Sequence, residues 1–239
     1  MYDRRKRFPA PGLFCLGLIW SLIGGAAAPV SASPEERREE EQLRVGWYAR
    51  IVTSMGEMVV RLLPDQAPQS VAHFASLARG ELEWSDPVTG DVHQEPFYDG
   101  SRVHYAKAGV SFELGRKSGS GSVAPLMYVP LEGPGPVNFY EAGRLGMGRS
   151  PMGRTSAVIF FVTVTPQPWL NENHPCFAEV ISGLDVAFRI TEVRTYTNTG
   201  RPIEDVRVEK IEVYPVGNPL ALPQVKPFVP TLAVPTPVK

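Results

Sequence analysis

Residues 160–180, with the sequence FFVTVTPQPWLNENHPCFAEV, carry side chains that could form a binding surface. Trp169 and His174 lie on a predicted loop rich in proline and asparagine, where aromatic and polar side chains are well placed to contact a ligand. Phe161 and Leu170 are open to two interpretations, core packing or the lining of a pocket, because apolar side chains serve both. The stretch therefore offers side chains that could contact a ligand and leaves that ligand open.

Covalent, metal and nucleotide chemistry find little support in the sequence. The histidines are scattered, without metal-ligand spacing, at positions 73, 93, 104 and 174. No glycine-rich loop has the strand-to-helix setting that phosphate binding needs. Cys176 is interpreted as a small core side chain, because no spacing places a base beside it. The sequence predicts neither a metal nor a cofactor.

The first 32 residues have the pattern of a secretory signal peptide. A basic start at residues 4–7 precedes an apolar stretch at residues 13–28, and residues 30–32 offer a cleavage site before Ser33. An uncleaved membrane anchor is the alternative. Cleavage would leave a periplasmic or extracellular protein without a stable membrane span.

The chain that remains after cleavage is mildly acidic. Removing residues 1–32 takes away four of the 24 basic and one of the 25 acidic residues, which leaves a net charge of −4. This balance gives no indication of nucleic-acid binding, and we expect a monomer. Residues 33–47 are predicted to form a charged linker that cannot bury a core, either solvated or as a short exposed helix. Cys176 becomes the single cysteine, so an internal disulfide is excluded.

The strand and helix signals of residues 48–215 predict one mainly β domain. Period-two hydrophobic patterns indicate strands within residues 48–63, 102–107, 110–114, 160–164, 176–181 and 207–214. One helix is expected to begin at Pro68 and to stop at Gly80. A second, at residues 184–190, is expected to present Leu184, Ala187 and Phe188 to the core. Many short strands with two helices favour a barrel or a sandwich.

The C-terminal residues 216–239 are predicted to form a disordered tail. Residues 215–239 hold seven prolines, each of which fixes its backbone angle and removes a hydrogen-bond donor. Such a segment could dock on a partner as a polyproline helix or remain passive.

An ordered set of motifs resembles the cyclophilin family. The set comprises the opening hairpin, PDQAPQSVAHF at residues 64–74, FYDG at residues 97–100, FFVTVTPQPWL at residues 160–170 and the closing helix, and it spans residues 49–213. The resemblance implies a closed eight-stranded antiparallel barrel capped by two helices, with a shallow groove for a proline-containing peptide or unfolded protein. It also implies peptidyl-prolyl cis-trans isomerase activity, which needs only tighter binding of the twisted amide.

The resemblance assigns groove roles to individual positions. Tyr105 stands where the family has its catalytic arginine, and it offers one neutral donor in place of a charged fork. Ile159 replaces a glutamine that binds the peptide backbone, and Arg149 is the candidate substitute donor. The predicted catalytic residues are therefore Tyr105 and Arg149. The predicted substrate-binding residues are Val110 in place of a pocket Phe, Glu113 in place of a Gln, and the retained Phe161, Trp169, Leu170 and His174.

Three hypotheses follow for the function. The first is an exported cyclophilin-type domain that binds proline-containing polypeptide with weak or lost isomerase activity. The second is a working isomerase that assists folding and uses Arg149 or Tyr105 as its donor. The third is a non-catalytic envelope scaffold that acts through its proline-rich tail.

Overall fold

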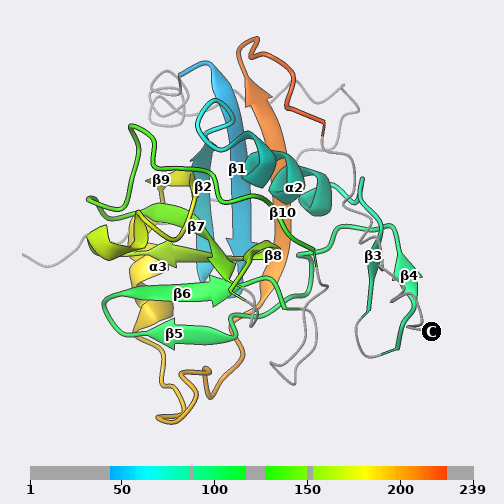
Figure 1. Cartoon of the computed structure of the whole chain (residues 1–239). Coiled ribbons are helices and arrows are strands. Elements are labelled where there is room, and N and C mark those ends of the chain that lie inside the picture. Colours follow the sequence, from blue (N-terminus) through cyan, green and yellow to red (C-terminus); the bar gives the residue numbers. More distant parts are fainter. Residues whose placement is uncertain (1–43, 87–88, 117–126, 150–152, 225–239) are drawn as a thin grey trace, which may run out of the picture. The chain divides into compact units, whose positions relative to one another are not determined.

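The computed structural model describes residues 44–86, 89–116, 127–149 and 153–224 (Figure 1). Its main feature is an eight-stranded antiparallel sheet in the order β10-β1-β2-β9-β7-β8-β6-β5. The strands are β1 (Gly46–Thr53), β2 (Gly56–Leu62), β5 (Tyr105–Lys107), β6 (Ser111–Leu114), β7 (Arg144–Arg149), β8 (Thr155–Thr163), β9 (Cys176–Ser182) and β10 (Val208–Val216). The predicted signal peptide at residues 1–32 and most of the predicted linker lie outside the described residues.

The sheet curls so that its two edges approach each other. Val103 N donates to Val206 O at 2.9 Å, and Val208 N donates to Ser101 O at 2.8 Å. An isolated bridge also joins Arg102 to Arg207. The eight antiparallel strands confirm the predicted barrel-like fold. In the described part of the chain, β5 and β10 are not paired as strands, and the two edges of the sheet meet through these contacts beside β5. The barrel is therefore slightly less closed than predicted.

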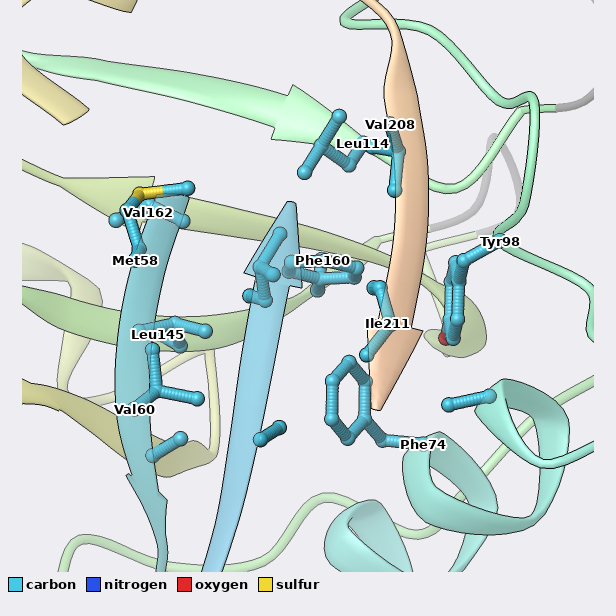
Figure 2. Close-up of a cluster of buried hydrophobic side chains, with 14 of the residues drawn as sticks. Met58, Val60, Phe74, Tyr98, Leu114, Leu145, Phe160, Val162, Val208 and Ile211 are labelled. Atoms are coloured by element: carbon cyan, nitrogen blue, oxygen red, sulfur yellow. The ribbon is translucent and has the colours of Figure 1, made fainter. Parts of the chain in front are cut away.

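The core fills the inner side of the curled sheet. The inward positions alternate along the strands, as expected for sheets with one buried face. Figure 2 shows Met58 and Val60 of β2, Leu145 of β7 and Phe160 of β8 converging on this core. The Phe74 ring lies 5.3 Å from Phe160 and 5.4 Å from Tyr98 between ring centroids. The faces that point away from this core are consequently free to build a site.

The helix α2 (Pro68–Ala78) covers one end of the core. Pro68 occupies its first turn, where a missing N–H costs nothing, and Val71, Phe74 and Leu77 are fully buried. Ala67 at the N-terminus offers no capping side chain. The Glu132 carboxylate takes that role from a distant loop by accepting hydrogen bonds from the backbone N–H groups of Gln69 and Ser70.

The helix α3 (Leu184–Thr191) corrects the face that we expected to be buried. Ala187 is fully buried as predicted, but Leu184 is 39% exposed and Phe188 is 46% exposed. Val186 and Ile190 face the core in their place. The buried stripe of this helix therefore consists of Val186, Ala187 and Ile190. The larger side chains of Leu184 and Phe188, four residues apart, are partly exposed to solvent.

Three further segments complete the described chain. β3 (Trp84–Ser85) pairs with β4 (Val92–His93) in the excursion after α2. The 3₁₀ helix η1 (Pro168–Leu170) lies between β8 and β9. β10 continues to Val216, and the Trp47 Nε1–H donates to Leu220 O at 2.8 Å, which holds the start of the tail against β1.

Residues 225–239 of the predicted tail lie outside the described residues. In the described ranges, no helix is long and apolar enough to cross a membrane.

Candidate functional site

A row of side chains crosses the outer face of the sheet from β5 to β7. Tyr105 lies opposite Glu113, Glu113 lies opposite Phe161, and Phe161 lies opposite Gly146. Directly paired residues of antiparallel strands place their side chains on the same face. Since the neighbouring Phe112 and Leu114 belong to the core, this row occupies the face away from it.

Glu113 is held in this row by His104. The two side chains meet at 3.2 Å between His104 Nε2 and Glu113 Oε2, and His104 N also donates to Glu113 O at 3.1 Å. Burial lowers the pKa of His104 below its usual value, and the nearby Arg116 charge lowers it further against the opposing effect of Glu113. His104 is therefore neutral near pH 7 and donates its Nε2–H to a charged carboxylate.

The ring of Phe161 anchors a second, smaller hydrophobic cluster on this face. Its core members are Phe139, Phe161 and Cys176, and the side chains packed against them are Leu63, Val137 and Leu170. The Phe139 and Phe161 rings lie 5.5 Å apart between centroids. A Cβ on Gly146 would stand 2.4 Å from Phe161 Cζ and 2.6 Å from Phe139 Cζ. The two rings can pack at these positions because Gly146 has no side chain.

His174 stands against the edge of Phe161. The ring centroids are 5.1 Å apart with an interplanar angle of 88°. Its Nδ1 lies 2.8 Å from Met147 O, a contact in which the nitrogen donates. Burial lowers the pKa of His174, with a smaller opposing effect from the bond to Met147. A neutral ring with Nδ1–H leaves Nε2 as an acceptor.

Arg149 lies near His174 but is already engaged. Its charge acts to lower the pKa of His174. The Arg149 guanidinium donates from Nε and Nη2 to Gly153 O at 3.1 and 2.5 Å, and from Nη1 to Asn173 Oδ1 at 3.0 Å. The side chain is exposed. It joins the end of β7 to the loop before β9.

Cys176 behaves as the core side chain that the sequence predicted. It is 3% exposed, and burial raises the pKa of its thiol to about 12. The Sγ–H contacts Ala178 O at 3.7 Å. A thiol that stays protonated at physiological pH is a poor nucleophile.

The sequence of residues 48–213 identifies the family of this chain. A family model described as cyclophilin type peptidyl-prolyl cis-trans isomerase/CLD matches residues 48–213. The chain belongs to the cyclophilin family. This cyclophilin is 34% identical over 168 residues to peptidyl-prolyl cis-trans isomerase B of Streptomyces anulatus, an alignment that covers 70% of this chain and 95% of that protein. It is 30% identical over 168 residues to peptidyl-prolyl cis-trans isomerase A of Mycobacterium tuberculosis, covering 69% and 91%.

A solved structure shares the fold of this cyclophilin. The cyclophilin type peptidyl-prolyl cis-trans isomerase of Cryptosporidium parvum, determined in the presence of the dipeptide Ala-Pro, aligns with a TM-score of 0.58. The alignment has 20% sequence identity and covers 70% of this chain and 98% of that chain. At this identity, the likeness concerns the fold.

The remaining predicted residues lie around the row. Tyr105 is half-buried at the sheet edge, where a Cβ on Gly200 would stand 2.4 Å from its Cε2, so its ring packs against that glycine. Trp169, on η1, is 66% exposed, while Leu170 is half-buried in the Phe161 cluster. Val110 lies in the turn between β5 and β6 and donates its N–H to Lys107 O at 3.0 Å.

Ile159, which stands in the position of a family glutamine, is 5% exposed. It packs beneath Gly148, where an added Cβ would stand 2.7 Å from its Cγ2. An aliphatic side chain in this place provides no hydrogen bond to a bound peptide.

Sequence reasoning missed three residues of this face, namely His104, Phe139 and Gly146. Strand alternation would put His104 on the opposite side from Tyr105, but β5 begins only at Tyr105, so alternation does not extend to its neighbour. Phe139 precedes β7 on a loop without a periodic pattern, and Gly146 resembles a turn residue. The match of this region to the family was the only signal that could have drawn attention to them.

In the described part of the chain, two of the cavities lie outside the row. One, of about 370 Å³, is lined by residues that include Met55, Val193 and Arg194. The other, of about 820 Å³, lies between Trp47, Leu63, Val137 and Leu220. Since Leu63 and Val137 also pack against the Phe161 cluster, the larger cavity borders the rear of the candidate site.

Proposed function

We propose that this cyclophilin is an exported domain that binds proline-containing polypeptide, with prolyl isomerase activity that is weak or lost. The family match and the names of the relatives support the prolyl isomerase class. The structural neighbour determined with Ala-Pro supports a proline ligand. The observation that carries the reduced activity is the row itself, in which a phenol, Tyr105, stands beside Glu113, and Glu113 in turn stands beside Phe161.

The chemistry explains why this residue matters. Rotation about an X-Pro bond has a barrier of about 18–20 kcal/mol because amide resonance is lost in the twisted state. A catalyst must bind that state more tightly than the planar ones. A charged donor forms hydrogen bonds roughly twice as strong as those of a neutral hydroxyl. Tyr105 therefore supplies less stabilisation than an arginine would, and Ile159 supplies no hydrogen bond.

Binding and isomerisation can be separated by NMR. We expect a blocked peptide that contains Ala-Pro to shift resonances of the Phe161 face, while exchange between its cis and trans forms is accelerated little. Trp169→Ala should weaken binding because this exposed ring stands next to Leu170. Val92→Ala, an exposed apolar change on β4, is the matched control and should have no effect. Fast exchange at a low ratio of protein to peptide would refute the reduced activity.

A working isomerase that uses Arg149 is the second candidate. It is favoured by the electrostatic influence of Arg149 on His174, whose ring contacts Phe161. In that case Arg149→Gln should reduce exchange much more than it reduces binding, and Tyr105→Phe should leave exchange intact. Equal losses of binding and exchange would contradict a role as donor.

Export rests on the pattern of residues 1–32. Expression of the full chain in a host with a secretory pathway should yield a mature protein that begins at Ser33, as measured by mass spectrometry of the exported fraction. A protein recovered from the cytoplasm with Met1 intact would rule export out.

A scaffold that acts through its tail is the third candidate. Removal of residues 225–239 keeps Leu220, whose carbonyl accepts from Trp47, and tests the part of the predicted tail beyond this contact. Unchanged recovery of a partner by the truncated protein would count against this function.

A further inference from the structure

The centre of the outer row carries a negative charge at Glu113. Its side chain is 35% exposed, whereas its partner His104 is only 7% exposed. The strand alternation of β6 directs Glu113 away from the core, between Tyr105 and Phe161. A ligand on this face therefore meets a carboxylate one strand away from the Phe161 ring, about 4.8 Å along the direction of the hydrogen bonds.

Among the residues that the structure describes, no lysine or arginine forms an ion pair with Glu113, whose side-chain partner is His104. His104, which is neutral near pH 7 because burial lowers its pKa, donates a hydrogen bond without supplying a positive charge. Arg149 directs its donors to Gly153 and Asn173. Lys107, two residues from Tyr105 on β5, is exposed to solvent. Other charged or titratable groups near this part of the face include Arg116, which acts on His104, and His174, on which Glu113 itself acts.

We propose that Glu113 makes this face select proline segments that carry a lysine or arginine beside the proline. This inference rests on the proposed function, because the proline itself is assigned to the Phe161 cluster. A cationic side chain next to that proline would approach the partly exposed carboxylate, and an acidic side chain would be repelled by it. A neutral glutamine in this position would neither attract a cationic side chain nor repel an acidic one.

NMR titration tests the proposal by measuring the affinity of the protein for three blocked peptides. The peptides differ only in the residue before proline, which is Lys, Ala or Glu. A second set varies the residue after proline. We expect the wild-type protein to bind the Lys peptide about two- to fivefold more tightly than the Glu peptide in at least one set, as for a partly exposed ion pair. The ratio should fall toward one in about 1 M salt, where the Debye length is about 3 Å.

Two variants of equal charge separate a local effect from a general one. Glu113→Gln keeps an oxygen that can accept from His104 and removes the charge, so the ratio of affinities should fall to about one. Glu209→Gln makes the same change at an exposed position of β10 and should keep the wild-type ratio. Correct folding of each variant is checked by the amide spectrum.

The outcomes distinguish this proposal from the function on which it rests. Equal affinity of the wild-type protein for all peptides would overturn charge selection while leaving proline binding intact. A preference for Lys that survives in Glu113→Gln would assign it to another residue and would also overturn the proposal. Failure to bind any peptide, the Ala peptide included, would overturn the proposed function together with it.

Discussion

At the scale of single residues, the outer face depends on Gly146. The two rings of Phe139 and Phe161 occupy the volume into which a side chain at this position would project. Gly146 lies in the middle of β7, where glycine ordinarily weakens a strand. Its presence there is explained by the close approach of the two rings, and it fixes where Phe161 can lie.

Replacing this glycine should therefore disturb the site and the fold together. Gly146→Ala is expected to reduce the free energy of unfolding by about 1–3 kcal/mol, because the added methyl overpacks two buried rings. Urea denaturation measures this change, and shifted Phe161 resonances would locate it. Gly133→Ala is the matched control, since a Cβ there would meet nothing within 4 Å. Equal stability of the two variants would contradict the account of Gly146.

Three histidines whose pKa values are lowered in the folded protein make stability depend on pH. Burial lowers the pKa of His73, His104 and His174. A histidine with a lowered folded pKa is protonated more readily in the unfolded chain, so acid favours unfolding. The stability that these residues contribute is fully present above the ordinary histidine value of about 6.5 and is lost as the pH falls below it.

His73 offers the simplest test, since burial is the whole cause of its shift. The free energy of unfolding should be lower at about pH 5.5 than at about pH 7.5. The difference should shrink in His73→Gln, because this side chain takes up no proton in that range. Denaturant melts of both proteins at both pH values measure it. A difference that is the same in both proteins would contradict the role of His73.

The residues of the site could be predicted only in part from the sequence. Phe161, Leu170 and His174 do lie together on one face, as their match to the family implied. The contact of Glu113 with His104 and the packing of Phe139 on Phe161 could not be predicted, because they depend on where β5 begins and on the room left by Gly146. Local patterns contain neither piece of information.

At the scale of elements, α2 is stabilised by a loop from elsewhere in the chain. Glu132 accepts from Gln69 N at 2.7 Å and from Ser70 N at 2.9 Å, and the Ser70 hydroxyl donates to the same carboxylate at 2.5 Å. A negative charge at a helix N-terminus also interacts favourably with the helix dipole. The loop before β7 is tied to the helix by this contact.

Loss of this cap should be measurable. Glu132→Ala is expected to reduce the free energy of unfolding by about 0.5–2 kcal/mol, the usual cost of a lost N-terminal cap. Glu132→Gln retains one acceptor oxygen and should lose less. Urea melts give the energies, and hydrogen exchange of the Gln69 and Ser70 amides gives the location. Unchanged exchange of these amides in Glu132→Ala would show that the carboxylate is not their partner in solution.

The strand β7 shows where element prediction from sequence ends. Its sequence RLGMGR has two glycines and none of the β-branched residues that typify strands. It is nevertheless a central strand, paired with both β8 and β9. Because its glycines have no side chains, Phe139, Phe161 and Ile159 can pack directly against the backbone of β7. The residues of such a strand are chosen for contacts with distant segments, so its own sequence pattern does not predict a strand.

At the scale of the whole molecule, the fold follows from the alternation and the order of its elements. The hairpin of β1 and β2, the helix that begins at Pro68 and the final strand are all recognisable by local pattern, and their order matched a known family. The way the barrel edges meet involves contacts of residues 101–103 with residues 206–208. These are about a hundred residues apart in sequence, and no local pattern encodes them.

Our central proposal is that this protein binds proline-containing segments but catalyses their cis/trans isomerisation weakly or not at all. Two-dimensional exchange NMR on a proline peptide, with wild-type protein and Tyr105→Arg compared at equal occupancy, tests it most directly. We predict binding by both proteins and at least about tenfold faster cis/trans exchange with Tyr105→Arg, since a preorganised charged donor stabilises the twisted amide. Exchange by the wild-type protein that equals or exceeds that of Tyr105→Arg would contradict the claim.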